Sequence, residues 1–159
     1  MEYNVIAAGI ELVGTRISHI SIKNSIENLR RDAKRSMGLN IHEPLVKEED
    51  GRFISKMTID FEVAVDSDEE QNLSLQLSVE GVFLSQNGIG EEDFCRLVVV
   101  NGAAAIIGIA RGKIESITAA VFNEGKIVIP FVNVIDYYRE VAVKNMPKKK
   151  KTRAANKVQ

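Results

Sequence analysis

Two runs of alternating apolar and polar residues, at positions 53–65 and 73–83, constrain the fold of this chain more than any other feature. In the first run every odd position except Ser55 is apolar, and the even positions are mostly polar. The second run keeps the same parity from Leu73 to Phe83. A period of two places one face of a strand in a core and the other in water, as in antiparallel sheets. Because the connection between the runs is short and acidic, we predict a β-hairpin.

Small residues recur at every fourth position of a helical segment at residues 103–122. This spacing stacks side chains on one face of a helix, and small side chains let another backbone approach closely. A second row, of larger residues, has the spacing of a buried face. We therefore expect one face of the helix to pack in its own domain and the other to meet a second copy, at an interface that includes two leucines of the hairpin. The expected interface residues are Ala104, Gly108, Gly112, Ser116, Ala120, Leu75 and Leu77.

Upstream of the hairpin we predict two further strands. Residues 10–23 form the first, and its parity changes near Gly14, which indicates a bulge. Residues 39–46 form the second, for which Pro44 favours an edge position.

Residues 24–38, between these strands, resemble a helix. Asn24 and Glu27 have the spacing of a capping box, and the apolar residues that follow recur on one helical face. We predict a short surface helix. A mobile loop is the alternative, because the segment carries six charges.

Downstream of the hairpin the chain is predicted to be mostly helical. A short helix begins after Gly90, and Asn101 with Gly102 separates it from the long helix. Residues 126–130 are extended, and residues 134–144 form a last helix. Because the strands precede the helices, the predicted fold class is α+β.

The charge divides the chain into an acidic body and a basic tail. Residues 144–159 contain seven basic residues and no acid, so the rest holds 21 − 7 = 14 basic and 22 acidic residues, a net charge of −8. We predict one domain over residues 1–143 and a disordered tail over residues 144–159. Cys95 is the only cysteine, the N-terminus lacks a signal-peptide pattern, and the longest uncharged apolar run has 14 residues, too few for a membrane span. These features predict a cytoplasmic protein.

No pattern in the sequence predicts catalysis, a cofactor or a metal site. The segment from Gly108 to Ile114 has three residues between its glycines where a phosphate-binding loop needs four, and lacks the Ser or Thr that holds magnesium. His19 and His42 have no further ligands at zinc-binding spacing. The lysine run at 148–151 lacks interleaved aromatic residues, so we expect no specific nucleic-acid recognition. The expected protein is not an enzyme.

Four segments resemble the SecB family of protein-export chaperones. Residues 79–83, Val-Glu-Gly-Val-Phe, are similar to the family's Glu/Gln-x-Gly-Ile-Phe strand, and residues 110–114 to its Ala-Arg-Glu-x-Ile helix. Residues 127–134 are similar to Leu-x-Leu-x-Pro-Val-Asn-Phe, and residues 136–138 to the Asp-Ala-Leu-Phe/Tyr that follows. The order and spacing of these segments carry the resemblance over residues 5–144.

The resemblance implies a fold, an assembly and an activity. SecB-like chaperones have a four-stranded antiparallel sheet with two helices on one face. They assemble as dimers of dimers through their long helices and hold unfolded preproteins without ATP. We expect this chain to be a homotetrameric holdase with an apolar client groove, and its acidic body to favour basic client segments. The expected client-binding residues are Leu39, Ile41, Leu45, Val46, Ile127, Ile129, Phe131, Val134, Ile135 and Tyr138.

Two departures from the family pattern bear on partners. His19 and Lys23 stand where the family has first-strand acids that meet the export ATPase, and the tail is basic where the family's tends to be acidic. A chaperone dedicated to one antitoxin is therefore the alternative to a role in protein export. Two other classes stay open, a hot-dog-type acyl-CoA enzyme and an oligomeric scaffold without clients. For the enzyme, the long helix offers only Glu115, without a paired His or Asp.

Overall fold

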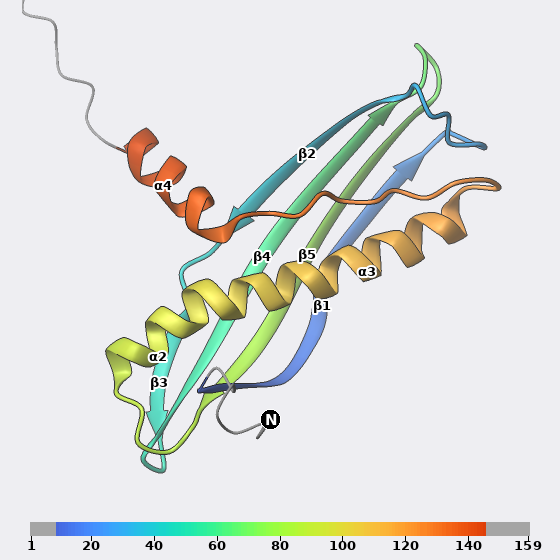
Figure 1. The fold of residues 1–159 in the computed structure, drawn as a ribbon. Helices are drawn as coiled ribbons and strands as arrows, with labels where there is room; N and C mark the ends of the chain where they lie inside the picture. The colour runs from blue at the N-terminus through green and yellow to red at the C-terminus, as the bar shows by residue number, and fades with distance from the viewer. Residues whose placement is uncertain (1–8, 146–159) are drawn as a thin grey trace, which may run out of the picture.

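The computed structural model describes residues 9–145, in which one face of an antiparallel sheet is crossed by a long helix (Figure 1). The strands are β1 (Ile10–Asn24), β2 (Lys34–Ile41), β3 (Leu45–Glu49), β4 (Arg52–Asp66) and β5 (Asn72–Ser85). They are followed by α2 (Glu91–Leu97), a π-helical turn (Val98–Gly102), α3 (Ala103–Val121) and α4 (Val134–Asn145). The predicted α+β fold class is confirmed. From residue 146 onward the predicted tail lies outside the described residues.

The sheet is four strands wide, in the order β1-β5-β4-β2, and β3 also pairs with β4. The predicted hairpin is β4 with β5, and its odd-numbered residues form the core. Met57, Ile59 and Phe61 are all 0% exposed on the face that α3 covers. At the hairpin tip the carboxylate of Asp68 accepts two backbone N–H groups of the turn, so the acidic connection is a hydrogen-bonded turn.

β1 lies at one edge of the sheet and pairs with β5 through two register shifts. The shift between Leu12 and Gly14 confirms the predicted bulge, and a second shift lies between Ile17 and His19. Extra residues in a bulge leave ladder groups unpaired and bend the strand.

The other edge is shared by β2 and β3 because the predicted strand 39–46 is interrupted near Pro44. β2 pairs with β4 up to Ile41, and β3 resumes at Leu45. The predicted helix 24–38 is wrong. The side-chain oxygen of Asn24 accepts the N–H of Ile26 at 3.0 Å, and residues from Lys34 onward belong to β2. An Asn side chain accepts a nearby backbone N–H both in turns and at helix N-caps. The Asn24 and Glu27 pattern therefore does not distinguish a turn from a helix start.

α2, the π-helical turn and α3 form one continuous helix, so the predicted break at Asn101 and Gly102 is wrong. A Cβ atom added to Gly102 would lie 3.0 Å from the ring of Phe83, and one added to Gly81 would lie 2.8 Å from Cδ1 of Ile106. These two glycines allow the helix and β5 to approach closely. Gly102 therefore serves packing instead of ending the helix.

α3 buries one side on the sheet and leaves the row of small residues exposed. Ile106, Ala110 and Ile114 are 0% exposed. All five residues of the row at positions 104, 108, 112, 116 and 120 are exposed, and a Cβ atom on Gly108 or Gly112 would meet nothing within 4 Å. The predicted open face of the helix is thus present in the chain.

The prediction that Leu75 and Leu77 lie in an oligomer interface is wrong for the chain in this conformation. Both are 1% exposed, since they point from β5 into the core between the sheet and the helix. Their burial completes the domain itself, and no partner can reach them.

The continuous helix Glu91–Val121 is long and apolar enough, by length and composition, to cross a membrane. Core helices of soluble proteins meet the same criterion. Of its most apolar stretch, 39% is buried against the rest of the chain. The remaining share includes the open face of α3.

Candidate functional site

Residues 126–133 form an extended segment, here called the arm, that returns beside α3 and leads into α4 (Figure 1). Its first anchor is Thr118, a residue of α3 that is 0% exposed. The Thr118 hydroxyl donates to the carbonyl of Ile114 at 2.8 Å and accepts the N–H of Ile127 at 2.9 Å. A single buried hydroxyl therefore joins the arm to the helix.

Two charged residues of α3 hold the arm further along. Nε of Arg111 donates to the carbonyl of Ile129 at 2.8 Å, and its guanidinium lies 3.9 Å from the ring centroid of Phe131. Glu115 pairs with Lys126 at 2.9 Å. The hydrogen bond from Lys126 holds the pKa of Glu115 below its ordinary value. The carboxylate on which the enzyme alternative depends is thus engaged in fixing the arm.

The arm and β2 border an apolar groove of about 330 Å³, here called the arm–β2 groove. It presents two exposed apolar side chains, since Met37 is 36% and Val128 is 54% exposed. Among the lining residues within the described range 9–145, only Arg35 is charged. The residues that line the groove are Arg35, Ser36, Met37, Val63, Ile127, Val128, Ile129 and Pro130.

β2 leaves its outer edge free beside this groove. The N–H of Ile41 donates to the hydroxyl of Tyr137 at 3.0 Å, so it points away from β4. Hydrogen-bonding directions alternate along an antiparallel strand, and the N–H and C=O groups of Arg35, Met37 and Leu39 therefore point the same way. Within residues 9–145 no backbone hydrogen bond links these groups to the arm. A free strand edge beside an apolar groove can bind an extended peptide by adding a strand.

β2 suits strand addition better than the opposite edge of the sheet. Its pairing with β4 runs from Lys34 to Ile41 without a register shift, whereas β1 carries two shifts. Bulges are a common way to protect an edge from pairing.

Two tyrosines at the start of α4 end the free edge. Tyr137 bonds to the backbone of Ile41, and its ring packs edge-on against Tyr138 with centroids 5.4 Å apart. Burial raises the pKa of Tyr138 above its ordinary value, and Tyr137 and Glu43 add to the effect. The unpaired stretch of β2 is therefore limited to residues before Ile41.

Six of the predicted client-binding residues lie on the helix-covered side of the sheet. Their exposed fractions differ. Ile41 and Val134 belong to the core at 8% and 5% exposure, and Ile127 and Ile129 line the groove at 3% and 2%. The other two, Leu39 and Val46, are half-buried against the core. Ile41 and Val134 cannot contact a client in this conformation.

Of the ten predicted residues only Ile127 and Ile129 are among the described residues that line the groove. The four residues not yet placed also lie outside it. Leu45 is 73% exposed on the opposite face of the sheet, because it pairs with Lys56, whose side chain faces outward. Phe131 and Ile135 are 88% and 49% exposed but do not line the groove. Tyr138 is half-buried in α4. The placement of Leu45 in the groove is wrong, since strand parity restarts after Pro44.

Sequence reasoning missed Arg35, Met37 and Val128. The first two were assigned to the helix that is not formed. Their alternation with Leu39 and Ile41 was the signal that could have found them. Val128 lies between the predicted residues Ile127 and Ile129, and no separate pattern in the sequence marks it.

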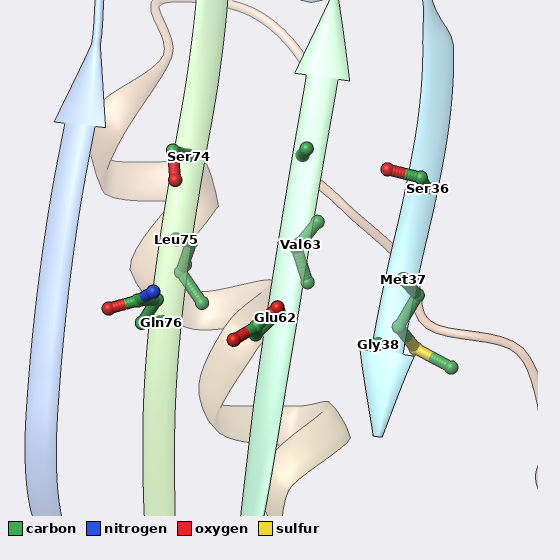
Figure 2. Close-up of a pocket in the computed structure, with 9 residues that line it drawn as sticks. Ser36, Met37, Gly38, Glu62, Val63, Ser74, Leu75 and Gln76 are labelled. Carbon is green, nitrogen blue, oxygen red and sulfur yellow. The ribbon is translucent and has the colours of Figure 1, made fainter. Parts of the chain in front are cut away.

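The outer face of the sheet is polar and only shallowly hollowed. Figure 2 shows Ser36, Glu62, Ser74 and Gln76 on neighbouring strands, with the helix behind the sheet. These residues line a hollow of about 230 Å³. His19 and Lys23 belong to this face of β1, where they pair with Ser78 and Ser74 of β5. His19 and Lys23, which the sequence comparison singled out, are therefore exposed on the side of the sheet away from the arm–β2 groove.

A His, an Asp and a Ser also meet on this outer face. Nε2 of His42 lies 2.6 Å from Oδ2 of Asp60, and the hydroxyl of Ser78 donates to Oδ1 of Asp60 at 2.7 Å. A catalytic triad places the His between the Ser and the Asp, whereas here the Asp lies in the middle. Partial burial opposes ionisation of Asp60, but the bonds from Ser78 and His42 outweigh it and hold its pKa below the ordinary value. The cluster stabilises a carboxylate and does not activate the serine.

The structure offers no candidate metal site among residues 9–145. No group of three His, Cys, Asp or Glu side chains in this range is arranged to hold an ion. The arm–β2 groove is consequently the best candidate site in the described part of the chain.

Comparisons with known proteins connect this geometry to one fold. No protein-family model matches the chain, and no curated protein matches its sequence. Among solved structures, it is similar to the Mycobacterium tuberculosis Rv1957 SecB-like chaperone in complex with a ChAD peptide from the Rv1956 HigA1 antitoxin. The TM-score is 0.54 at 11% identity, over 79% of this chain and 91% of that one. The chain has a SecB-like fold, as the sequence resemblance implied.

Proposed function

We propose that this protein is an ATP-independent holdase that binds extended segments of non-native polypeptides in the arm–β2 groove. The observation that carries the proposal is the free edge of β2 beside exposed Met37 and Val128. Client side chains would enter the groove while the client backbone bonds to the N–H and C=O groups of residues 35–39. The fold it shares with a chaperone supports this role.

The size of the groove sets the strength of binding at one site. Burying a Leu-sized side chain contributes about 1.5–3 kcal/mol, whereas ordering each client residue costs about 1–2 kcal/mol. A groove of about 330 Å³ accepts few such side chains. Useful affinity therefore requires several grooves that act on one client.

An assembly of several copies would supply those grooves, and the open face of α3 is the surface we assign to it. Gly108 and Gly112 leave room there for the backbone of a second helix. Gly108→Leu is expected to shift the protein to a smaller assembly in sedimentation experiments, with its circular dichroism unchanged. A wild-type protein that is monomeric at all concentrations, or a variant of unchanged mass, contradicts this arrangement.

The holdase is tested by the aggregation of a chemically denatured model protein on dilution, without ATP. Stoichiometric wild-type protein should suppress aggregation. Val128→Ser should weaken suppression, whereas Val143→Ser, which changes a valine 64% exposed on α4, should not. Absence of suppression across several clients, or an equal loss in both variants, argues against binding in this groove.

A chaperone dedicated to one partner is the second candidate function. It is favoured by the neighbouring structure, in which a SecB-like chaperone holds a peptide from an antitoxin. The two functions differ in the range of clients that the protein protects. A general holdase suppresses the aggregation of unrelated clients, whereas a dedicated one protects a single partner and leaves the others to aggregate.

A further inference from the structure

A lone cation lies at the end of the arm–β2 groove nearest the start of β2. Arg35 pairs in register with Val65, which is buried in the core, so its side chain extends on the same side of the sheet as the arm. Among the described residues that line the groove it is the only charged one. Within residues 9–145 the Arg35 side chain donates one long hydrogen bond, of 3.4 Å, from Nη2 to the carbonyl of Arg30.

Within residues 9–145 no carboxylate lies within salt-bridge distance of Arg35. Asp32, three residues before Arg35 in the chain, pairs with Arg30 at 2.7 Å, and Glu115 on α3 pairs with Lys126 at 2.9 Å. A guanidinium presents a planar fork of donors that can bond both oxygens of a carboxylate. This pairing is stronger beside apolar surface, because water competes less for the charged groups. Arg35 is thus available to an acid that arrives with a ligand.

We propose that the groove selects extended apolar segments that carry an Asp or Glu where the bound strand passes Arg35. This inference rests on the proposed function and specifies its client. It replaces the expectation from net charge, because the acidic body favours basic segments whereas the groove itself is cationic. The chain's own basic segment, residues 144–159, has the wrong charge to occupy this end of the groove.

The length of the free edge of β2 sets the length of the peptide that can bind there. From Arg35 to Ile41, where Tyr137 ends the free edge, a strand spans roughly 20 Å at about 3.4 Å per residue. A peptide of about eight residues covers this distance. Its acidic residue would pair with Arg35 while apolar residues at alternate positions face the groove.

The test compares three such peptides that differ only in one terminal residue, Glu, Gln or Lys, by their Kd for the full chain. The wild-type protein should bind the Glu peptide about five- to tenfold more tightly than the Gln peptide, and the Lys peptide most weakly. Arg35→Gln should remove the difference between the Glu and Gln peptides, and Arg35→Glu should reverse the order. Lys34→Glu makes the same change in net charge on the opposite face of β2 and should keep the wild-type order.

The outcomes separate this inference from the function on which it rests. If none of the peptides binds, peptide binding in the groove is itself wrong. If all three peptides bind the wild type equally, peptide binding in the groove is retained and selection by Arg35 is overturned. An equal effect of Lys34→Glu and Arg35→Glu overturns it as well, since net charge alone then explains the preference. It is also overturned if Arg35→Glu changes the mass of the assembly and leaves peptide affinity unchanged, because a second copy then fills the groove.

Discussion

Replacing Thr118 by Val tests whether the arm is held by one buried hydroxyl. Val has nearly the shape of Thr, so the change leaves no large cavity, but it removes the acceptor for the N–H of Ile127. That N–H belongs to a residue 3% exposed, and an unsatisfied buried donor costs about 1–3 kcal/mol. For a chain of this size each kcal/mol lowers the Tm by about 2–4 °C. We therefore expect Thr118→Val to lower the Tm by about 2–12 °C.

Urea unfolding at one fixed protein concentration measures this cost, because any assembly would make stability depend on concentration. Amide hydrogen exchange at Ile127 should accelerate in the same variant. Ser116→Ala is the matched control. It removes an exposed hydroxyl of the same helix, bonded among the described residues only to the carbonyl of Gly112. Ala keeps this position of the row small, as at positions 104 and 120, so stability should change by no more than about 0.5 kcal/mol. A Thr118→Val protein that matches the wild type in both stability and Ile127 exchange refutes the reasoning.

Three further predictions concern stability. Gly102→Ala should destabilise the protein by about 1–3 kcal/mol in urea unfolding because its Cβ meets the rigid ring of Phe83, whereas Gly14→Ala, with nothing within 4 Å, should not destabilise it. Ser55→Ala should be neutral or stabilising in thermal unfolding, since the Ser55 hydroxyl is buried and has no hydrogen-bond partner among the described residues; a loss above about 1 kcal/mol would contradict this. Because the pKa of Asp60 is lowered in the folded state, its ionised form stabilises the protein above the unfolded pKa, and this contribution is lost as the pH falls through the lowered folded value. Asp60→Asn should therefore flatten the fall in unfolding free energy below about pH 4, and a curve parallel to the wild type would count against it.

The sequence predicted the hairpin and the long helix well because both depend on periodicity within one segment. Residues 57, 59 and 61 face the core as their alternation requires, and the small residues of α3 lie on one exposed face. Local chemistry was ambiguous at Asn24, where a turn and a helix cap use the same hydrogen bond. The error at Asn24 placed Arg35 and Met37 in a helix and removed both from the predicted groove.

The groove itself could be predicted only in part. Ile127 and Ile129, two of the residues predicted to bind clients, line the arm–β2 groove. The arm itself is positioned by Arg111, Glu115 and Thr118, residues of a different element. Contacts of this kind depend on how the chain crosses itself, which no local pattern encodes. The same reason explains Leu45, whose face is decided by the restart of pairing after Pro44.

Hydrogen exchange of the β2 backbone with and without an unfolded client tests the central claim most directly. If clients add a strand to β2, the amides of Arg35, Met37 and Leu39, which point away from β4, should become protected on binding. The amide of Ile41, already bonded to Tyr137, should change little. Protection confined to the outer face of the sheet, or client binding without protection of residues 35–39, would contradict the account.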